Sequence, residues 1–135
     1  MTNWDVLVTA ASQAELRANA ANSGHKVGSA GVLADGNIVV GVNIEDTSYV
    51  CILCAEQIMM GNVALANGGK LVATVAVHNG VPVAPCGRCR QLLYDHNPHM
   101  EVMVEPNTVV RVPELLPYIF RIDSTTAVQT GQSQM

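Results

Sequence analysis

The chain has 135 residues, of which 49% are hydrophobic and 13% are charged, and its formal net charge is −4. This length fits one domain with a substantial core, and the high apolar share suggests that part of the surface is buried against other copies of the chain. The mildly acidic balance, without any basic run, argues against a protein that binds nucleic acid.

We expect neither a secretory leader nor a membrane-spanning segment. Trp4 and Asp5 stand where a leader would carry basic residues before an apolar core, and no apolar run approaches the roughly 20 residues of a membrane helix. The four cysteines then favour metal binding or catalysis in a reducing compartment over disulfides. We therefore expect a cytoplasmic protein.

Apolar runs separated by turn residues predict alternating helices and strands. The predicted elements are a helix over 3–22, strands over 27–33 and 38–42, a helix over 54–66, a strand over 71–77, a helix over 86–96, strands over 101–104 and 109–111, and a short helix over 112–118. Asn3 suits the N-cap of the first helix, and Asp35-Gly36 predicts a hairpin between the first two strands.

The order of these elements predicts a layered α/β domain with a sheet of about five strands flanked by helices. The strand over 71–77 is apolar throughout and is expected at the centre of the sheet. We expect the domain to cover residues 1–122. The remaining segment, 123–135, is rich in Ser, Thr and Gln and is predicted to be a disordered tail.

Two cysteine motifs stand at the starts of two predicted helices: Cys54-Ala55-Glu56 and Pro85-Cys86-Gly87-Arg88-Cys89. Cys86 and Cys89 share one helical turn and can bind one ion together, and a helix N-terminus favours their thiolate forms. Cys54 would add a third ligand to a Zn²⁺ ion. The fourth position would then be open for water, as catalytic zinc sites require, with Glu56 placed to move protons.

A closed structural zinc site is the alternative reading of the same cysteines. Cys51 lies three residues before Cys54, so the chain also contains two Cys-x-x-Cys pairs, the ligand set of a Cys₄ site. Spacing alone does not separate the two arrangements. The helix-like runs after both pairs, and the match of Cys-Ala-Glu and Pro-Cys-x-x-Cys to the zinc-deaminase signature, favour the open site. Cys51 is then expected to be a buried small side chain.

With these motifs the chain resembles the small, homotetrameric cytidine deaminases, from about residue 27 to 120. The other matching stretches are Val27-Gly28-Ser29-Ala30, Asn43-Ile44-Glu45, Ser48-Tyr49 and Leu115-Leu116-Pro117-x-x-Phe120. The resemblance implies a three-layer α/β/α sandwich with a five-stranded mixed sheet, and one zinc ion per chain. It also implies hydrolytic deamination of cytidine or deoxycytidine in pyrimidine salvage, in which Glu56 protonates N3 of cytosine, zinc-hydroxide attacks C4 and ammonia leaves.

The resemblance further implies which side chains bind this small pyrimidine nucleoside. Asn43 and Glu45 would bind the ribose hydroxyls, and Ala55 would belong to the same site. Phe120 would stack on the pyrimidine held by a neighbouring subunit, so that a homotetramer would share its active sites. Neither a nucleic acid nor a membrane is expected as a partner.

Two positions depart from the family pattern. His25 replaces the aromatic residue that usually lines the base pocket, so it either lines a more polar or roomier pocket or is a hydrogen-bonded core histidine. Gln57 stands where an Arg often neutralises the thiolates, so we expect that charge to come from elsewhere, with Arg90 as the candidate. The blasticidin S deaminases share both cysteine motifs, and some have His before the Val-Gly step. Blasticidin S or an N4-substituted cytidine is therefore the alternative substrate.

Overall fold

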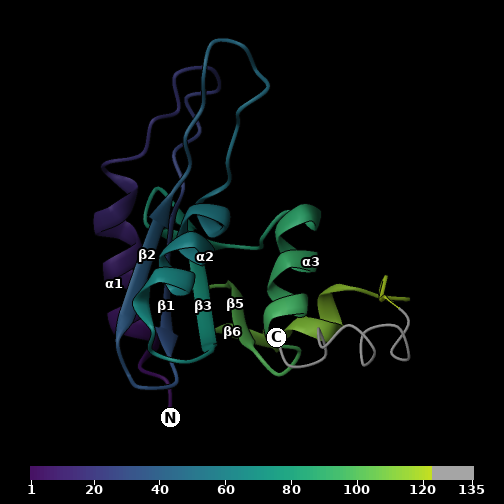
Figure 1. Cartoon of the computed structure of the whole chain (residues 1–135). Coiled ribbons are helices and arrows are strands. Elements are labelled where there is room, and N and C mark those ends of the chain that lie inside the picture. Colours follow the sequence, from purple (N-terminus) through teal and green to yellow (C-terminus); the bar gives the residue numbers. More distant parts are fainter. Residues whose placement is uncertain (123–135) are drawn as a thin grey trace.

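A computed structural model of the chain describes residues 1–122 (Figure 1). The tail predicted over 123–135 lies outside the described residues. The elements are α1 (Trp4–Glu15), β1 (Gly28–Leu33), β2 (Ile38–Val42), α2 (Ala55–Ala66), β3 (Leu71–His78), β4 (Val81–Val83), α3 (Gly87–His96), β5 (Glu101–Glu105), β6 (Thr108–Arg111) and a 3-10 helix (Val112–Leu115). No helix among these is long and apolar enough to cross a membrane.

A mixed sheet forms the middle layer of the domain. Five strands follow the order β2-β1-β3-β5-β6, with β3 and β5 parallel and the other pairs antiparallel. A sixth strand, β4, corrects the prediction of five. The residues Val81–Val83 form this strand because Asn79 and Gly80 both adopt positive φ angles, as a tight hairpin turn requires, and return the chain along the end of β3.

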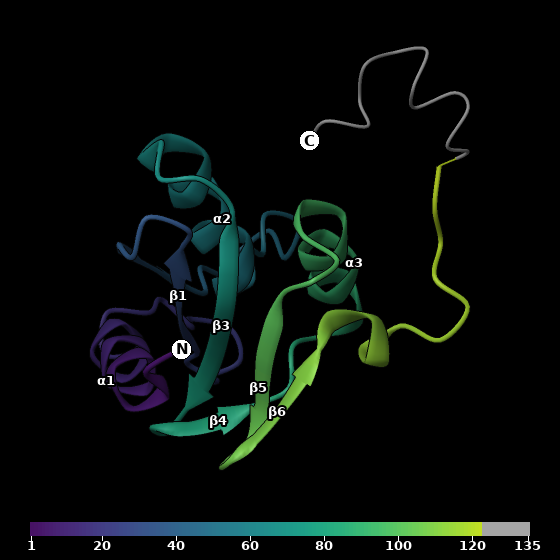
Figure 2. The same cartoon turned by 90° about the horizontal axis from the view of Figure 1, so that it is seen from below.

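Helices cover both faces of this sheet, so the predicted α/β/α sandwich is confirmed. Figure 2 shows α1 on one side and α2 with α3 on the other. On the α1 side, the buried cluster comprises Leu7, Ala11, Ala30, Ala73, Val75, Val77 and Met103. On the α2 and α3 side, it comprises Leu33, Met59, Val63, Leu71, Leu93, Met100, Val102, Val104 and Val112.

Two predicted helices are too long. Asn3 caps α1 as predicted, with its Oδ1 accepting from the Val6 N–H at 3.2 Å, but the helix ends at Glu15. The chain beyond it turns so that Asn19 can form a bridge with Ile44, in the loop after β2. The last helix is a single 3-10 turn, because Pro117 restricts the preceding residue to a non-helical conformation.

Glycine allows α2 to pack unusually close to the hairpin. A Cβ atom on Gly41 of β2 would lie 2.2 Å from the carbonyl oxygen of Ala55 and 2.4 Å from the nitrogen of Met59. On the other face, a Cβ on Gly28 would lie 2.1 Å from the Ala11 carbonyl oxygen of α1. The Gly41 contact involves the first turns of α2. It therefore sets where that helix begins relative to the sheet.

This contact predicts a sharp difference between two glycine substitutions. Gly41→Ala should lower the free energy of unfolding by about 1–3 kcal/mol, because the added methyl group must push α2 off β2. The matched control is Gly61→Ala in α2, where a Cβ meets nothing within 4 Å. That change should stabilise the protein by roughly 0.5–1 kcal/mol through better helix propensity. Urea denaturation measures both values, and equal stabilities would contradict the close approach.

Candidate active site

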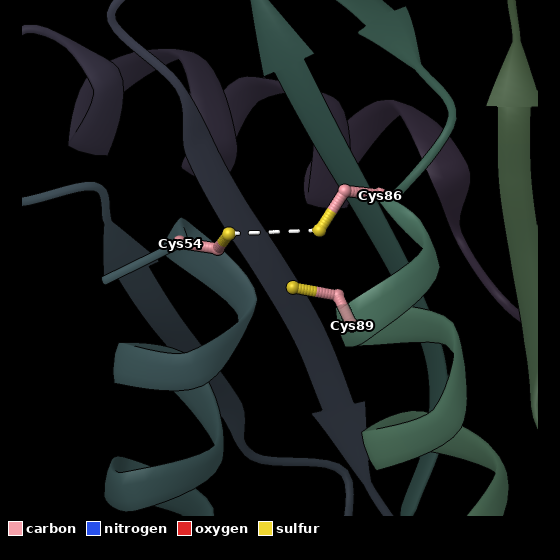
Figure 3. A group of neighbouring side chains, drawn as sticks. All are labelled: Cys54, Cys86 and Cys89. Atoms are coloured by element: carbon pink, nitrogen blue, oxygen red, sulfur yellow. Dashed lines mark hydrogen bonds between the residues drawn. The ribbon is translucent and has the colours of Figure 1, made fainter. Parts of the chain in front are cut away.

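Three cysteine side chains converge where α2 and α3 begin (Figure 3). Cys54 is the N-cap of α2, Cys86 is the N-cap of α3, and Cys89 lies in the first turn of α3. Their Sγ atoms all lie within 4.8 Å of one another, and those of Cys54 and Cys86 are 3.6 Å apart. A tetrahedral Zn²⁺ ion with Zn–S bonds of about 2.3 Å places its thiolates about 3.8 Å apart. The three thiols therefore fit a zinc ion.

Cys51 does not belong to this group. It is exposed in the loop before α2, where its backbone N–H donates to the Asp46 carboxylate at 3.3 Å. The prediction of a buried Cys51 is therefore wrong. Leu53 pairs with Ile44 in an antiparallel bridge, so the chain between the two cysteines is extended and a spacing of three residues does not place them on one helical face. Within residues 1–122, the metal-ligand group contains three cysteines.

Burial and hydrogen bonding act in opposite directions on these thiols. Burial raises the pKa of Cys89, and the charges of Glu56 and the other two thiols add to this effect. Burial also opposes ionisation of Cys86, but hydrogen bonds from the backbone and thiol of Cys89 and from Cys54 outweigh it and lower the pKa of Cys86. Three adjacent thiolates thus need a cation between them, which Zn²⁺ supplies.

Arg88 adds positive charge at the rim of the cluster. Its Nη2 donates to Cys54 Sγ at 3.3 Å, and this bond together with the charge of the thiolate raises the pKa of Arg88. Arg90, which the sequence suggested for this task, lies elsewhere. Its Nε donates to the Pro85 carbonyl at 2.8 Å and its Nη1 to the Leu115 carbonyl at 3.3 Å. Arg90 therefore joins α3 to the 3-10 helix.

Glu56 and Gln57, which follow Cys54 and Ala55, have different roles. The Glu56 side chain is buried beside Cys89, and burial raises the pKa of its carboxyl group. A carboxyl group with a raised pKa takes up a proton more readily than an exposed one, which suits a general acid–base group. Gln57 has a structural role, because its Oε1 accepts from the Cys54 backbone N–H at 2.7 Å. It fixes the residue that carries the first ligand.

A pocket of about 400 Å³ opens beside Glu56 and the thiols. Its volume lies within the range of small-molecule sites, about 300–1,000 Å³. The residues that line it include His25, Asn43, Glu45, Cys54, Ala55, Glu56 and Cys86. The structure thus brings together most of the residues singled out in the sequence. Of the residues predicted to bind the substrate, Phe120 is the one that does not line this pocket: its side chain is exposed, and its carbonyl accepts from Gln91 Nε2 at 3.1 Å.

Asn43 and Glu45 hold a segment of their own chain over the pocket. Asn43 accepts from the Val27 N–H at 2.9 Å and donates to the His25 carbonyl at 2.8 Å. Glu45 accepts from the backbone N–H and the hydroxyl of Ser23, at 2.9 and 2.7 Å, and from the Asn22 N–H at 3.0 Å. The Ser23 bonds are the main reason why the pKa of Glu45 is lowered. This clamp on residues 22–27 was missed because nothing local in the sequence signals it.

Comparisons with known proteins agree with this site. Residues 1–105 match the family described as the cytidine and deoxycytidylate deaminase zinc-binding region. The cytidine deaminase of Mycobacterium tuberculosis is 36% identical over 122 residues, which cover 90% of this chain and 92% of that protein. The blasticidin-S deaminase of Bacillus cereus is 35% identical over 106 residues, 69% of this chain and 75% of that protein.

A solved structure gives the same result for the fold. The crystal structure of cytidine deaminase from Mycobacterium leprae superposes with a TM-score of 0.82 at 44% identity, covering 87% of this chain and 99% of that one. The resemblance inferred from the cysteine motifs is thereby confirmed. The chain belongs to the cytidine and deoxycytidylate deaminase zinc-binding family.

Proposed function

We propose that this protein catalyses the zinc-dependent hydrolytic deamination of cytidine and deoxycytidine to uridine and deoxyuridine, with release of ammonia, as a step of pyrimidine salvage in the cytoplasm. The observation that carries the proposal is Glu56, buried beside three thiols at the edge of a pocket of about 400 Å³. Three ligands leave one zinc position open, the feature that separates catalytic from structural zinc sites. Relatives named cytidine deaminase that match most of the chain support the same reaction.

In this proposal Glu56 moves the protons. Zinc, when held by Cys54, Cys86 and Cys89, supplies Lewis-acid activation of a water molecule. The Glu56 carboxylate would accept one proton of that water molecule and deliver it to N3 of cytosine, and it would later pass the second proton of the same water to the leaving amino group. In sum, one water molecule adds at C4 and one ammonia molecule leaves from the same carbon. Burial of Glu56 raises its pKa, which suits a group that must be reprotonated in every turnover.

Substrate binding is assigned to other residues of the same pocket. Asn43 and Glu45 offer an amide and a carboxylate, which suit the ribose hydroxyls as donors and acceptors. Their hydrogen bonds to residues 22–27 keep both side chains in fixed positions. Ala55 and His25 complete the assigned contacts, because both line the pocket.

The assembly we infer is a homotetramer with shared active sites. Phe120 has 72% of its surface exposed and lies outside the pocket of its own chain, so it has no apolar partner there. The exposed Tyr118 and Ile122 flank it. An apolar segment of this kind suits insertion into a neighbouring subunit, where Phe120 would stack on the bound pyrimidine.

A second candidate function is deamination of blasticidin S or an N4-substituted cytidine. Two observations favour it: His25 gives the pocket a more polar wall, and the blasticidin-S deaminase of Bacillus cereus is among the relatives. A non-enzymatic Cys₄ zinc scaffold is disfavoured, because Cys51 lies outside the ligand group.

The ligand set predicts opposite results for two cysteine substitutions. Cys51→Ala should retain one zinc ion per chain and full turnover, since Cys51 is exposed and not part of the cluster. Cys86→Ala should lose most of its zinc and its activity, because two ligands do not hold the ion. Atomic absorption on the purified variants measures zinc content. Loss of zinc from Cys51→Ala would establish the closed site instead.

The proton-transfer role predicts the behaviour of Glu56→Gln, which keeps the size of the side chain. Turnover should fall about 10²–10⁴-fold, the usual contribution of a general acid–base group, while zinc content stays at one ion per chain. Loss of cytidine absorbance follows the reaction. Unchanged turnover would eliminate the mechanism.

Turnover of a panel of cytosine compounds identifies the preferred substrate. Cytidine, deoxycytidine, N4-substituted cytidines and blasticidin S are offered to the wild-type protein singly and in competition. The proposal expects the free nucleosides to have the highest kcat/KM. A clear preference for blasticidin S would replace it with the second candidate function.

Shared active sites predict complementation between two impaired variants. Phe120→Ala should raise the KM for cytidine by up to about tenfold, the value of one lost aromatic stack. When the Phe120→Ala and Glu56→Gln variants are mixed, unfolded and refolded together, mixed assemblies form. Some of their sites combine Glu56 of a Phe120→Ala chain with Phe120 of a neighbouring Glu56→Gln chain. Such hybrids should turn over cytidine better than the summed activities of the separate variants. A simple sum would place Phe120 in its own chain's site or outside any site.

A further inference from the structure

Two histidines that are distant in the sequence lie ring against ring beside the pocket. The centroids of His25 and His78 are 3.8 Å apart and their ring planes differ by 26°, which is a stacked arrangement. His25 lines the pocket together with Cys54, Glu56 and Cys86. His78 is the last residue of β3 and pairs with Val81 of β4, so its backbone is held at the end of the central strand. The stack therefore connects a loop residue of the pocket to the end of that strand.

His78 also holds the backbone next to His25. Its Nδ1 lies 2.6 Å from the Lys26 carbonyl oxygen. A carbonyl oxygen only accepts, so Nδ1 carries the proton of this bond. The other ring nitrogen, Nε2, faces the Asn79 side-chain amide at 3.3 Å. His78 thus contacts the His25 segment at two points, one through the ring face and one through Nδ1.

The remaining polar groups around His25 are fixed as well. The His25 N–H donates to Ser23 Oγ at 3.0 Å, and the His25 carbonyl accepts from Asn43 at 2.8 Å. The Ser23 hydroxyl in turn donates to Glu45. Because hydrogen bonds hold the His25 backbone at its N–H and at its carbonyl, side-chain rotation is the main motion that remains. The stacked ring of His78 restricts that rotation. A side chain in a pocket wall that is held in this way is pre-organised for a ligand.

We propose that His78 is a positioning residue that holds the His25 ring in the wall of the pocket, where His25 contacts the pyrimidine ring of the substrate and sets the affinity for it. The inference rests on the proposed function for the identity of the substrate. His25 presents an aromatic face with polar ring nitrogens, which matches a pyrimidine ring in both respects. His78 acts through His25 and takes no part in the proton transfers at Glu56.

The kinetic test uses zinc-loaded full-length protein and cytidine. His78→Ala should raise KM about three- to tenfold, the worth of one aromatic stack, with kcat within twofold of wild type. His78→Phe keeps a ring face and should recover most of the loss. His25→Ala/His78→Ala should be no worse than His25→Ala alone, because His78 acts only through His25. His99→Ala, which alters an exposed histidine, should match the wild type.

Several results would overturn the proposal. If the losses of the two single variants add in the double variant, His78 does not act through His25. A fall in kcat at constant KM would place His78 in the chemistry, and a His78→Phe variant as impaired as His78→Ala would remove the role of the ring stack.

A measurement without substrate separates this proposal from the function itself. The ring protons of His25, assigned by their loss in His25→Ala, should shift in the NMR spectrum of His78→Ala because the ring current of His78 is gone. An unchanged His25 signal would refute the positioning role. If the wild-type protein deaminates no cytosine compound while the His25 signal does shift, the proposed function fails and the positioning of His25 by His78 stands.

Discussion

Three thiols within 4.8 Å of one another are the constraint on which the rest of this site depends. Thiolates at such distances repel one another strongly, so they require compensating positive charge from their surroundings. The chain supplies it from two helix N-termini, with Cys54 and Cys86 as N-caps, and from Arg88 against Cys54. A divalent cation supplies the remainder. Because burial and neighbouring charges raise the pKa of Cys89, binding of the cation is coupled to loss of the proton from that thiol.

The hairpin positions this site through its smallest side chains. Ser29 of β1 and Gly41 of β2 are paired across the sheet, and both face α2. Ser29 Oγ donates to the Ala55 carbonyl at 3.0 Å, while the absence of a side chain at Gly41 lets the same turn of α2 rest on the strand. Because Glu56 follows Ala55 directly, this cross-strand pair sets the distance of the carboxylate from the thiols. The small residues of the hairpin thus serve the chemistry as well as the fold.

Local patterns in the sequence were sufficient for the hairpin through Asp35-Gly36, the central strand and the three-thiol cluster, since each depends on residues close in the chain or on a specific motif. The errors arose where a tertiary contact decides. Arg88 and Arg90 point about 200° apart around α3, and spacing alone does not tell which one faces Cys54. Cys51 has the spacing of a ligand, but the Leu53–Ile44 bridge extends the chain before α2 and leaves Cys51 exposed. The sixth strand, β4, forms because the turn at Asn79 and Gly80 brings Val81–Val83 back to pair with β3.

In the proposed function, metal binding and substrate choice depend on different segments of the chain that line one pocket. The ligands and Glu56 lie at the starts of α2 and α3, whereas His25 lies on a segment held by Asn43, Glu45 and the end of β3. A change at His25 therefore leaves the contacts of the thiols and of Glu56 intact. Relatives with the same cysteine motifs can then differ in the cytosine compound they deaminate through changes in residues 22–27 and their supports. In our proposal the stack of His25 on His78 is such a support, and it links the wall of the pocket to the end of β3.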